Sequence, residues 1–255
     1  MSSPMPQVPA GSGQHPIVLI VLSANRLEAS GAFYRDVFGW QLQPMSAELT
    51  GAVAPGGPMI ALRANLPEGF PAAIPYLAVP QVEAALAAVV ADGATEERAP
   101  WTIPGVGRMA RFKDASGTIY GLTTATSPDA VKPVPMPFGD NPKPPANTIC
   151  SLEMYAADGH AAGRFMQGRF GWGAQETMPQ YVAFDPGAGI GGVFQSHTPA
   201  APAMVYIYSN DVAATVVSLE AAGGKRMCEP MSMPGMGTFG YFTDPSGTPM
   251  GLIGP

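Results

Sequence analysis

The stretch FKDASGTIYGL at residues 112–122 returns near the end of the chain as YFTDPSGTPMGL at residues 241–252. Both contain the pattern Asp-x-Ser-Gly-Thr-x-x-Gly-Leu, which begins at Asp114 in the first copy and at Asp244 in the second. The pattern is typical of a tight turn, because Gly takes a positive φ without strain and the Asp side chain accepts hydrogen bonds from the next amides. We therefore expect a structural role, as a turn that leads into the last strand of each copy.

Other stretches recur in the same order. They are FYRDVFGW (33–40) and FMQGRFGW (165–172), IPYLAV (74–79) and MVYIYS (204–209), and TIPGVGR (102–108) and SMPGMGT (232–238). The spacing between the copies is identical for the two later pairs and for the Asp114 and Asp244 turns, and only slightly longer for Gly39 and Gly171. Four ordered matches at a nearly constant offset indicate a duplicated chain.

Proline content predicts where the two copies separate. Residues 126–148 contain seven prolines, which disfavour both helix interiors and sheet ladders and so predict an extended linker. We predict a flexible leader at 1–14, a first domain at 15–125, a Pro-rich linker at 126–146 and a second domain at 147–255.

Each half shows the same order of elements twice. An apolar, β-branched strand at 15–23 precedes a helix at 26–38 that ends at Gly39, and three short stretches separated by Gly and Pro follow as strands. In the second half, Asn210 or Asp211 is expected to cap a helix. The pattern predicts four βαβββ units, two in each half of the chain, and hence an α+β fold.

Composition excludes several classes of partner. The 255 residues are 46% hydrophobic and 13% charged, with a net charge of −6, and no Lys/Arg cluster offers a nucleic-acid surface. No apolar run reaches the roughly 20 residues of a membrane span, and the N-terminus is not typical of a signal peptide. Cys150 and Cys228 are expected to be reduced and buried. We predict a cytoplasmic monomer or homodimer that binds neither nucleic acid nor membrane.

The paired βαβββ units, FYxxxFGW after the first helix, PGxGR before a strand and DPxGxxxGL at the end together resemble the vicinal oxygen chelate superfamily. This group comprises glyoxalases, bleomycin-resistance proteins and extradiol dioxygenases, and the match is to its two-domain bacterial form. The resemblance covers nearly the whole chain outside the leader and linker. It implies tandem glyoxalase-like domains, in each of which two units form curled, mostly antiparallel sheets that face each other around a cavity.

The resemblance also implies where metal ligands would stand, namely on the first, fourth, fifth and last strands. These positions carry, in the first half, Val21, Leu62, Ile74 and Gly121, and in the second half, Glu153, Gln195, Met204 and Gly251. A catalytic divalent ion needs about three ligands, mostly carboxylate or imidazole, and neither set supplies them. We therefore predict no cofactor and disfavour a divalent metal, with Glu153, Gln195 and His197 as its weak candidates.

Strand alternation predicts which side chains line a cavity. Glu153 shares a face with Ser151 and Tyr155, and as a carboxylate in apolar surroundings it is the candidate catalytic base or substrate anchor, or else a structural hydrogen-bonding group. The candidate ligand-binding residues are Val21, Ile74, Tyr76, Tyr155, Gln195, Met204, Tyr206 and Tyr208. Met and aromatic side chains with a few polar tips are typical of a small-molecule pocket, and equally of a core.

Three functions stay open at this point. The leading one is a metal-independent small-molecule binding protein of the glyoxalase and bleomycin-resistance type. The alternative is a metal-dependent lyase, isomerase or dioxygenase that acts through Glu153 in the second domain. A third is a structural protein that kept only the fold, since fold alone does not determine function.

Overall fold

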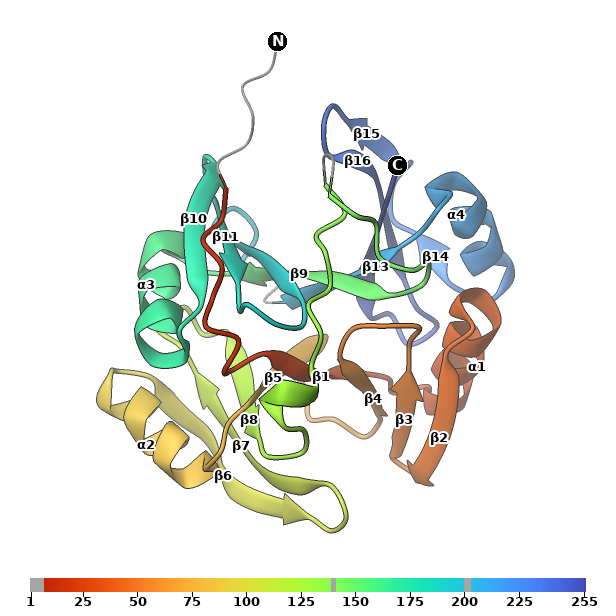
Figure 1. The fold of residues 1–255 in the computed structure, drawn as a ribbon. Helices are drawn as coiled ribbons and strands as arrows, with labels where there is room; N and C mark the ends of the chain where they lie inside the picture. Colours follow the sequence, from red (N-terminus) through yellow and green to blue (C-terminus); the bar gives the residue numbers. More distant parts are fainter. Residues whose placement is uncertain (1–6, 139–140, 200–202) are drawn as a thin grey trace. The chain divides into compact units, whose positions relative to one another are not determined.

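The computed structural model describes residues 7–138, 141–199 and 203–255. Within these ranges the chain forms α-helices packed on two multi-stranded mixed sheets, which confirms the α+β prediction (Figure 1). The four predicted βαβββ units are present and are called modules 1 to 4.

Modules 1 and 2 follow the predicted order. Module 1 consists of β1 (Ile17–Ser23), α1 (Leu27–Phe38), β2 (Gln41–Ser46), β3 (Leu49–Val53) and β4 (Met59–Arg63). Module 2 consists of β5 (Ala73–Ala78), α2 (Val82–Ala91), β6 (Thr95–Ile103), β7 (Gly107–Lys113) and β8 (Ile119–Thr123). Their strands form an eight-stranded sheet of order β2-β3-β4-β1-β5-β8-β7-β6.

Modules 3 and 4 repeat this arrangement after a 3₁₀ turn at Pro128–Ala130. Module 3 consists of β9 (Ile149–Tyr155), α3 (Gly159–Phe170), β10 (Gly173–Met178), β11 (Tyr181–Asp185) and β12 (Gly191–Gln195). Module 4 consists of β13 (Ala203–Tyr208), α4 (Val212–Ala221), β14 (Lys225–Arg226), β15 (Met231–Met233), β16 (Gly237–Thr243) and β17 (Pro249–Gly254). The sheet order is β10-β11-β12-β9-β13-β17-β16-β14, and β15 pairs with β16.

Helix ends follow the predicted local chemistry. α1 ends at Gly39, whose φ of 67° is left-handed, and Gly171 ends α3 with a φ of 65°. Of the two residues proposed to cap α4, Asp211 does so by accepting a hydrogen bond from the Ala214 amide at 2.9 Å. No helix of the described residues is long and apolar enough to cross a membrane.

The repeated turns have the predicted geometry. Asp114 accepts hydrogen bonds through Oδ1 from the amides of Ser116 (2.8 Å) and Thr118 (2.9 Å). Asp244 does the same for the two corresponding amides in the second copy, at 2.9 Å each. Gly117 and Gly247 adopt φ values of 85° and 87°, which residues with a side chain rarely take.

The chain packs as two compact units that do not follow chain order. Unit 1 contains the described N-terminal residues up to Val18, and the ranges Ile74–Pro133 and Leu152–Ala203, which hold most of modules 2 and 3. Unit 2 contains Leu19–Ala73 and Met204–Pro255, which hold most of modules 1 and 4, and also Val134–Ser151. The boundaries at 15–125, 126–146 and 147–255 follow the sequence repeat and stay a prediction.

Aromatic side chains join the two modules of unit 2. Phe33 and Phe38 of α1 lie with their ring centroids 5.9 Å and 6.0 Å from that of Phe242 on β16. Gly224 is required nearby, because a Cβ there would come within 2.7 Å of the Phe33 ring. The apolar face of α1 is therefore buried against module 4 as well as against its own strands.

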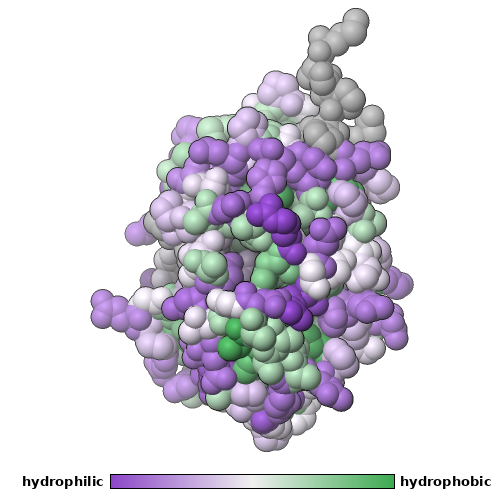
Figure 2. Space-filling model, turned by 90° about the vertical axis from the view of Figure 1, so that its left-hand side faces the viewer, coloured by the Kyte–Doolittle hydropathy of each residue, from purple (hydrophilic) through white to green (hydrophobic). Residues whose placement is uncertain are grey.

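Unit 1 has the corresponding core. Phe112 on β7 lies 6.3 Å from both Phe165 and Phe170 of α3. Figure 2 shows the face that carries α3 and α2. This face is mostly hydrophilic, and a hydrophobic area lies in its lower part, at the height at which Figure 1 places α2. Val90 of α2 is 41% exposed.

The N-terminal segment is bound to module 3 where it is described. The amides of Ser12 and Gly13 donate to the carbonyls of Gly171 (2.8 Å) and Pro186 (2.9 Å). Residues 7–14 of the predicted leader therefore include hydrogen-bonded backbone, and residues 1–6 lie outside the described residues.

The two cysteines are free, as expected, but only one is buried. Cys150 on β9 is fully buried, whereas the prediction was wrong for Cys228, which is exposed between the short strands β14 and β15. These edge strands are two and three residues long and leave their connection on the surface.

Candidate ligand-binding site

A tyrosine ring covers the last-strand ligand position in both copies. The parallel pairing of β5 with β8 sets Tyr76 beside Gly121, and that of β13 with β17 sets Tyr206 beside Gly251. A Cβ built on either glycine would overlap the ring of the neighbouring tyrosine. Because no side chain fits under either ring, a carboxylate cannot occupy these positions without displacing the tyrosine.

Module 4 forms a hydrophobic cluster together with Cys150 of β9 and two linker side chains, and we call this cluster the aromatic face. Its buried members are Cys150, Tyr206, Tyr208, Phe239 and Ile253, and its partly buried members are Val134, Phe138, Met204, Met236 and Tyr241. The Tyr206 ring meets Phe239 and Tyr241 edge-on at 6.3 Å and 6.2 Å. The structure thus brings the predicted residues Met204, Tyr206 and Tyr208 together on one face.

Phe138, which the sequence analysis missed, belongs to the same cluster. Its ring stacks on that of Phe239 at a centroid distance of 6.2 Å and an angle of 30°. Phe138 is the only aromatic residue of the proline-rich stretch 126–148. The sequence could have indicated this contact, because a single large aromatic side chain in a linker is expected to pack against an apolar surface.

The corresponding face of module 2 is charged. Arg111 occupies the position of Tyr241 and donates to both carboxylate oxygens of Glu97, at 2.6 Å and 3.2 Å. The Arg98 guanidinium lies 4.0 Å from the centre of the Trp101 ring, within cation–π range. The two copies of this surface therefore differ in character: the surface is apolar in module 4 and charged in module 2.

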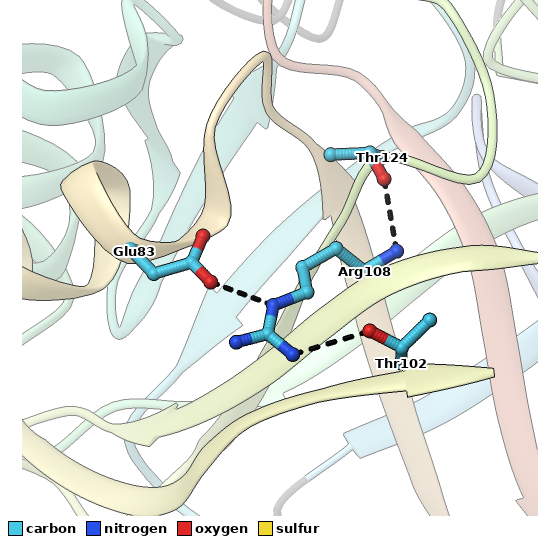
Figure 3. A network of polar contacts seen from close by, with 4 residues as sticks. All are labelled: Glu83, Thr102, Arg108 and Thr124. Atoms are coloured by element: carbon cyan, nitrogen blue, oxygen red, sulfur yellow. Dashed lines mark hydrogen bonds and ion pairs between the residues drawn. The ribbon is translucent and has the colours of Figure 1, made fainter.

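Arg108 of the PGxGR motif has a structural role in module 2. Figure 3 shows its side chain between α2 and the β6–β7 hairpin, donating to Glu83 at 2.6 Å and to Thr102 at 3.2 Å. Its amide donates to the Thr124 hydroxyl at 3.0 Å. The pKa of Glu83 is lowered by the hydrogen bond from Arg108.

Glu153, the candidate catalytic residue, is half-buried on β9. Its neighbours along the strand, Leu152 and Met154, are fully buried, and they point to the other side of the sheet because side chains alternate along a strand. Tyr155 is half-buried on the same side as Glu153.

Gln195 is fully buried, and its side chain organises the loop that follows β12. Its Oε1 accepts from the amides of His197 (2.9 Å) and Thr198 (2.7 Å), and its Nε2 donates to the Thr198 carbonyl at 2.8 Å. The Gln195 amide oxygen, which would be the metal ligand, thus already accepts hydrogen bonds from two backbone amides.

The three histidines occupy separate places. His197 lies on the surface with Nε2 at 3.2 Å from the Tyr181 hydroxyl. His160 lies 3.3 Å from Glu176 at the wall of an open cleft of about 410 Å³ at the start of α3. His15 is half-buried rather than exposed, with Nδ1 at 2.9 Å from the Ala78 carbonyl.

The candidate residues divide between the two units. Unit 1 holds Ile74, Tyr76, Glu153, Tyr155, Gln195 and His197, and unit 2 holds Val21, Met204, Tyr206 and Tyr208. Among the described residues, no three His, Cys, Asp or Glu side chains come together as a metal site would require. The donors at the expected ligand positions therefore do not fit a divalent ion.

Residues 16–119 match the family model described as Glyoxalase/Bleomycin resistance protein/Dioxygenase superfamily. The match lies within the first copy of the repeat. Curated relatives include the "Putative glyoxylase CFP32" of Mycobacterium bovis and of Mycobacterium tuberculosis, each 26% identical over 92% of both chains.

Solved structures of a glyoxalase and of a dioxygenase share the fold. A Mn(II)-bound glyoxalase from Novosphingobium aromaticivorans matches with a TM-score of 0.63 at 16% identity, covering 96% of this chain and 83% of that one. The 2,3-dioxygenase LapB from Pseudomonas sp. KL28 matches with a TM-score of 0.65 at 14% identity, covering 96% and 93%. At these identities the likeness concerns the fold alone.

Proposed function

We propose that this protein is a metal-independent small-molecule binding protein of the glyoxalase and bleomycin-resistance type. The observation that carries the proposal is the placement of the Tyr76 and Tyr206 rings over Gly121 and Gly251. In both copies an aromatic ring covers the position where metal-dependent relatives are expected to hold a carboxylate ligand. Binding then depends on apolar contact and a few hydroxyl groups.

The aromatic face of module 4 is the ligand site in this proposal. It combines flexible thioethers from Met204 and Met236 with the rings of Tyr206, Phe239 and Tyr241. Thioethers adapt to irregular shapes, and tyrosine hydroxyls supply orientation, as the 3.4 Å contact between Tyr206 and Tyr241 illustrates. The ligand class is a small aromatic or otherwise largely apolar molecule.

A thermal-shift screen over apolar, aromatic and antibiotic-like compounds in EDTA tests the proposal. A ligand at 100 times its dissociation constant is expected to stabilise the folded state by about 2.7 kcal/mol. Met204→Lys should abolish the shift, because it places a charge on the aromatic face, whereas Met59→Lys, at a 41% exposed site of module 1, should not. The proposal fails if no compound stabilises the protein, or if both variants respond alike.

The second candidate function is a metal-dependent lyase, isomerase or dioxygenase that acts through Glu153. The names of the mycobacterial relatives and the Mn(II)-bound glyoxalase of similar fold favour it. Elemental analysis of protein purified without chelators separates the two. We expect less than about a tenth of an equivalent of Mn, Fe, Ni or Zn, since about three protein ligands are needed to hold such an ion. A full equivalent that is lost in Glu153→Gln would establish the enzyme instead.

A further inference from the structure

Sulfur gathers on one surface hairpin of module 4. Residues 226–238, which we call the sulfur hairpin, read RMCEPMSMPGMGT and contain five sulfur atoms in thirteen residues. Of the eight large hydrophobic side chains exposed in the described residues, five are methionines, and three of these stand in this hairpin: Met227 (55%), Met231 (50%) and Met233 (42%). Cys228 is also exposed and free.

Strand register places the thioethers along one face. Met231 pairs with Phe239 and Met233 with Gly237 in the antiparallel β15–β16 ladder, so both side chains lie on the same side. The Met227 amide donates to the Tyr241 carbonyl at 2.8 Å, which continues the row beside β16. Met236 lies in the turn that closes the hairpin, its amide bonded to the Met233 carbonyl at 3.0 Å.

The fold does not require this sulfur. The equivalent positions of the module 2 hairpin, in the first copy of the repeat, carry Glu97, Arg98, Trp101, Ile103 and Val106. Those residues form the same β-hairpin with Trp101 opposite Met109 and Ile103 opposite Gly107. Residues 96–108, which correspond to the sulfur hairpin, thus contain no sulfur atom, while the sulfur hairpin exposes four thioethers or thiols to water. Such an exposed cluster indicates binding rather than packing.

Thiolate and thioether groups are soft donors that select Cu(I) over oxygen-preferring ions. We propose that the sulfur hairpin is a binding site for a soft monovalent cation, Cu(I) or its analogue Ag(I). Cys228 supplies the thiolate, and two or three of the exposed residues Met227, Met231 and Met233 complete the coordination. Binding exchanges the thiol proton for the metal, so that one H⁺ is released for each Cu(I) bound and no electron is transferred.

Cys150 does not compete for this ion. It is fully buried, its Sγ lies 3.5 Å from the Tyr206 carbonyl as a donor, and burial raises the pKa of its thiol far above the ordinary range. It therefore stays protonated, whereas a metal-binding cysteine must lose its proton. The site is also separate from the divalent-metal positions discussed above and does not depend on the proposed function.

Anaerobic titration of the full-length reduced protein with Cu(I), in competition with a chromophoric Cu(I) chelator, tests the proposal. We expect one equivalent to bind, with release of one proton. The double variant Met231→Leu/Met233→Leu should weaken binding by about tenfold or more, since each tenfold loss needs only about 1.4 kcal/mol of lost coordination. Cys228→Ser should weaken it further. Leucine matches methionine in size, and circular dichroism checks that the variants remain folded.

The matched control is Met45→Leu/Met59→Leu, which removes two comparably exposed thioethers from module 1 (49% and 41%) and should leave Cu(I) affinity unchanged. A second readout is the alkylation rate of Cys228, which Ag(I) should suppress in the wild type and much less in the Met231→Leu/Met233→Leu variant. Absence of Cu(I) retention by the wild type overturns the proposal. So does an affinity of the Met231→Leu/Met233→Leu variant within about threefold of wild type, because a lone thiol would then explain the binding.

Discussion

The hydroxyl of Thr118 donates a 2.7 Å hydrogen bond to the backbone carbonyl of Tyr155, 37 residues further along the chain and in another module. Thr248 makes the same bond to the carbonyl of Ser23 in unit 2. In each turn the serine two residues before the threonine accepts a backbone amide from the partner module, namely that of Ala157 or of Arg26 (2.9 Å each). Through these hydrogen bonds, the repeated turn connects the last strand of one module to the first strand of another.

Replacing Thr118 or Thr248 by valine should reduce the free energy of unfolding by about 1–2 kcal/mol each, because a buried carbonyl loses its donor while the shape is kept. The two threonines are 1% and 4% exposed. Urea unfolding measures the change. Thr95→Val, at an exposed position of β6, is the control and should be near neutral. Equal effects at all three positions would mean that the hydroxyl bonds do not fasten the modules.

Introducing a methyl group beneath either tyrosine ring should be costly. Gly121→Ala and Gly251→Ala are each expected to lower the free energy of unfolding by about 1–3 kcal/mol, since the new Cβ overlaps Tyr76 or Tyr206. In a Tyr206→Ala background the Gly251→Ala substitution should cost much less, because the ring is gone. Chemical denaturation of the four proteins of this cycle gives the coupling energy directly.

Gly168 is the control for that experiment. It lies exposed in α3, and an added Cβ meets nothing within 4 Å, so Gly168→Ala should stabilise the protein by about 0.5–1 kcal/mol. A coupling energy near zero between positions 206 and 251 would remove the main support for the metal-independent proposal.

Local structure followed from sequence because local chemistry determines it. Gly39, Asp211 and the Asp-x-Ser-Gly-Thr turns each act through residues within a few positions, and each was predicted correctly. The packing of modules 1 with 4 and 2 with 3 was not foreseen, because it depends on contacts between residues far apart in the chain, such as the 2.7 Å bond from Ser30 to Asp244.

The sequence did hold a signal for that packing. Tyr34 of α1 corresponds to Met166 of α3, and Met250 of β17 corresponds to Tyr120 of β8. In each unit one tyrosine hydroxyl lies near the turn aspartate, and the aspartate charge adds to burial of the tyrosine in raising that tyrosine's pKa. Tyrosine and methionine thus exchange places between the two copies of the repeat. Such an exchange indicates that the helix position and the strand position pack against each other.

The candidate site was only partly predictable for a related reason. Tyr206 and Tyr208 were found because strand alternation assigns them a face. The ring of Phe138 reaches them from the linker, and no periodicity connects a linker to a strand. The sulfur-free and sulfur-rich hairpins differ at the same positions of the repeat, so this asymmetry could have been read from the sequence.

Asp244 should make the stability of unit 2 depend on pH. Burial raises the pKa of this carboxyl above its ordinary value of 3.8, and hydrogen bonds from Ser30 and the turn amides offset this only in part. Between the two values the folded state holds more protons than the unfolded state, so stability falls as pH rises through that window. The free energy of unfolding of wild type minus that of Asp244→Asn should therefore decrease as pH rises from below 3.8, and then become constant.

Urea unfolding of wild type and Asp244→Asn at a series of pH values measures this difference. Asp36 provides a control of opposite sign, because the hydrogen bond from Arg35 lowers the pKa of this exposed carboxyl. The free energy of unfolding of wild type minus that of Asp36→Asn should increase as pH rises towards 3.8. This change should be small, because the Asp36 and Arg35 side chains both face solvent. A difference for Asp244→Asn that grows with pH would contradict the assignment.

Phe138 should compete with ligands for the aromatic face. Its ring stacks on Phe239 at 6.2 Å, and its segment of the linker belongs to unit 2 together with module 4. Phe138→Ala should lower the free energy of unfolding by about 1–3 kcal/mol through lost ring contact. It should also raise the affinity for aromatic ligands by about tenfold, because a ligand then fills apolar space without displacing a side chain.

Val134→Ala is the matched control, because Val134 is the other linker side chain on the cluster but lacks a ring. Both variants are expected to lose stability, and only Phe138→Ala should gain a thermal shift with the compounds that stabilise the wild type. If Phe138→Ala is destabilised and binds no compound better, the ring is part of a closed core. The aromatic face would then be packing surface, and the ligand site would have to lie elsewhere, with the charged face of Arg111 and Glu97 in module 2 the next to probe with polar ligands.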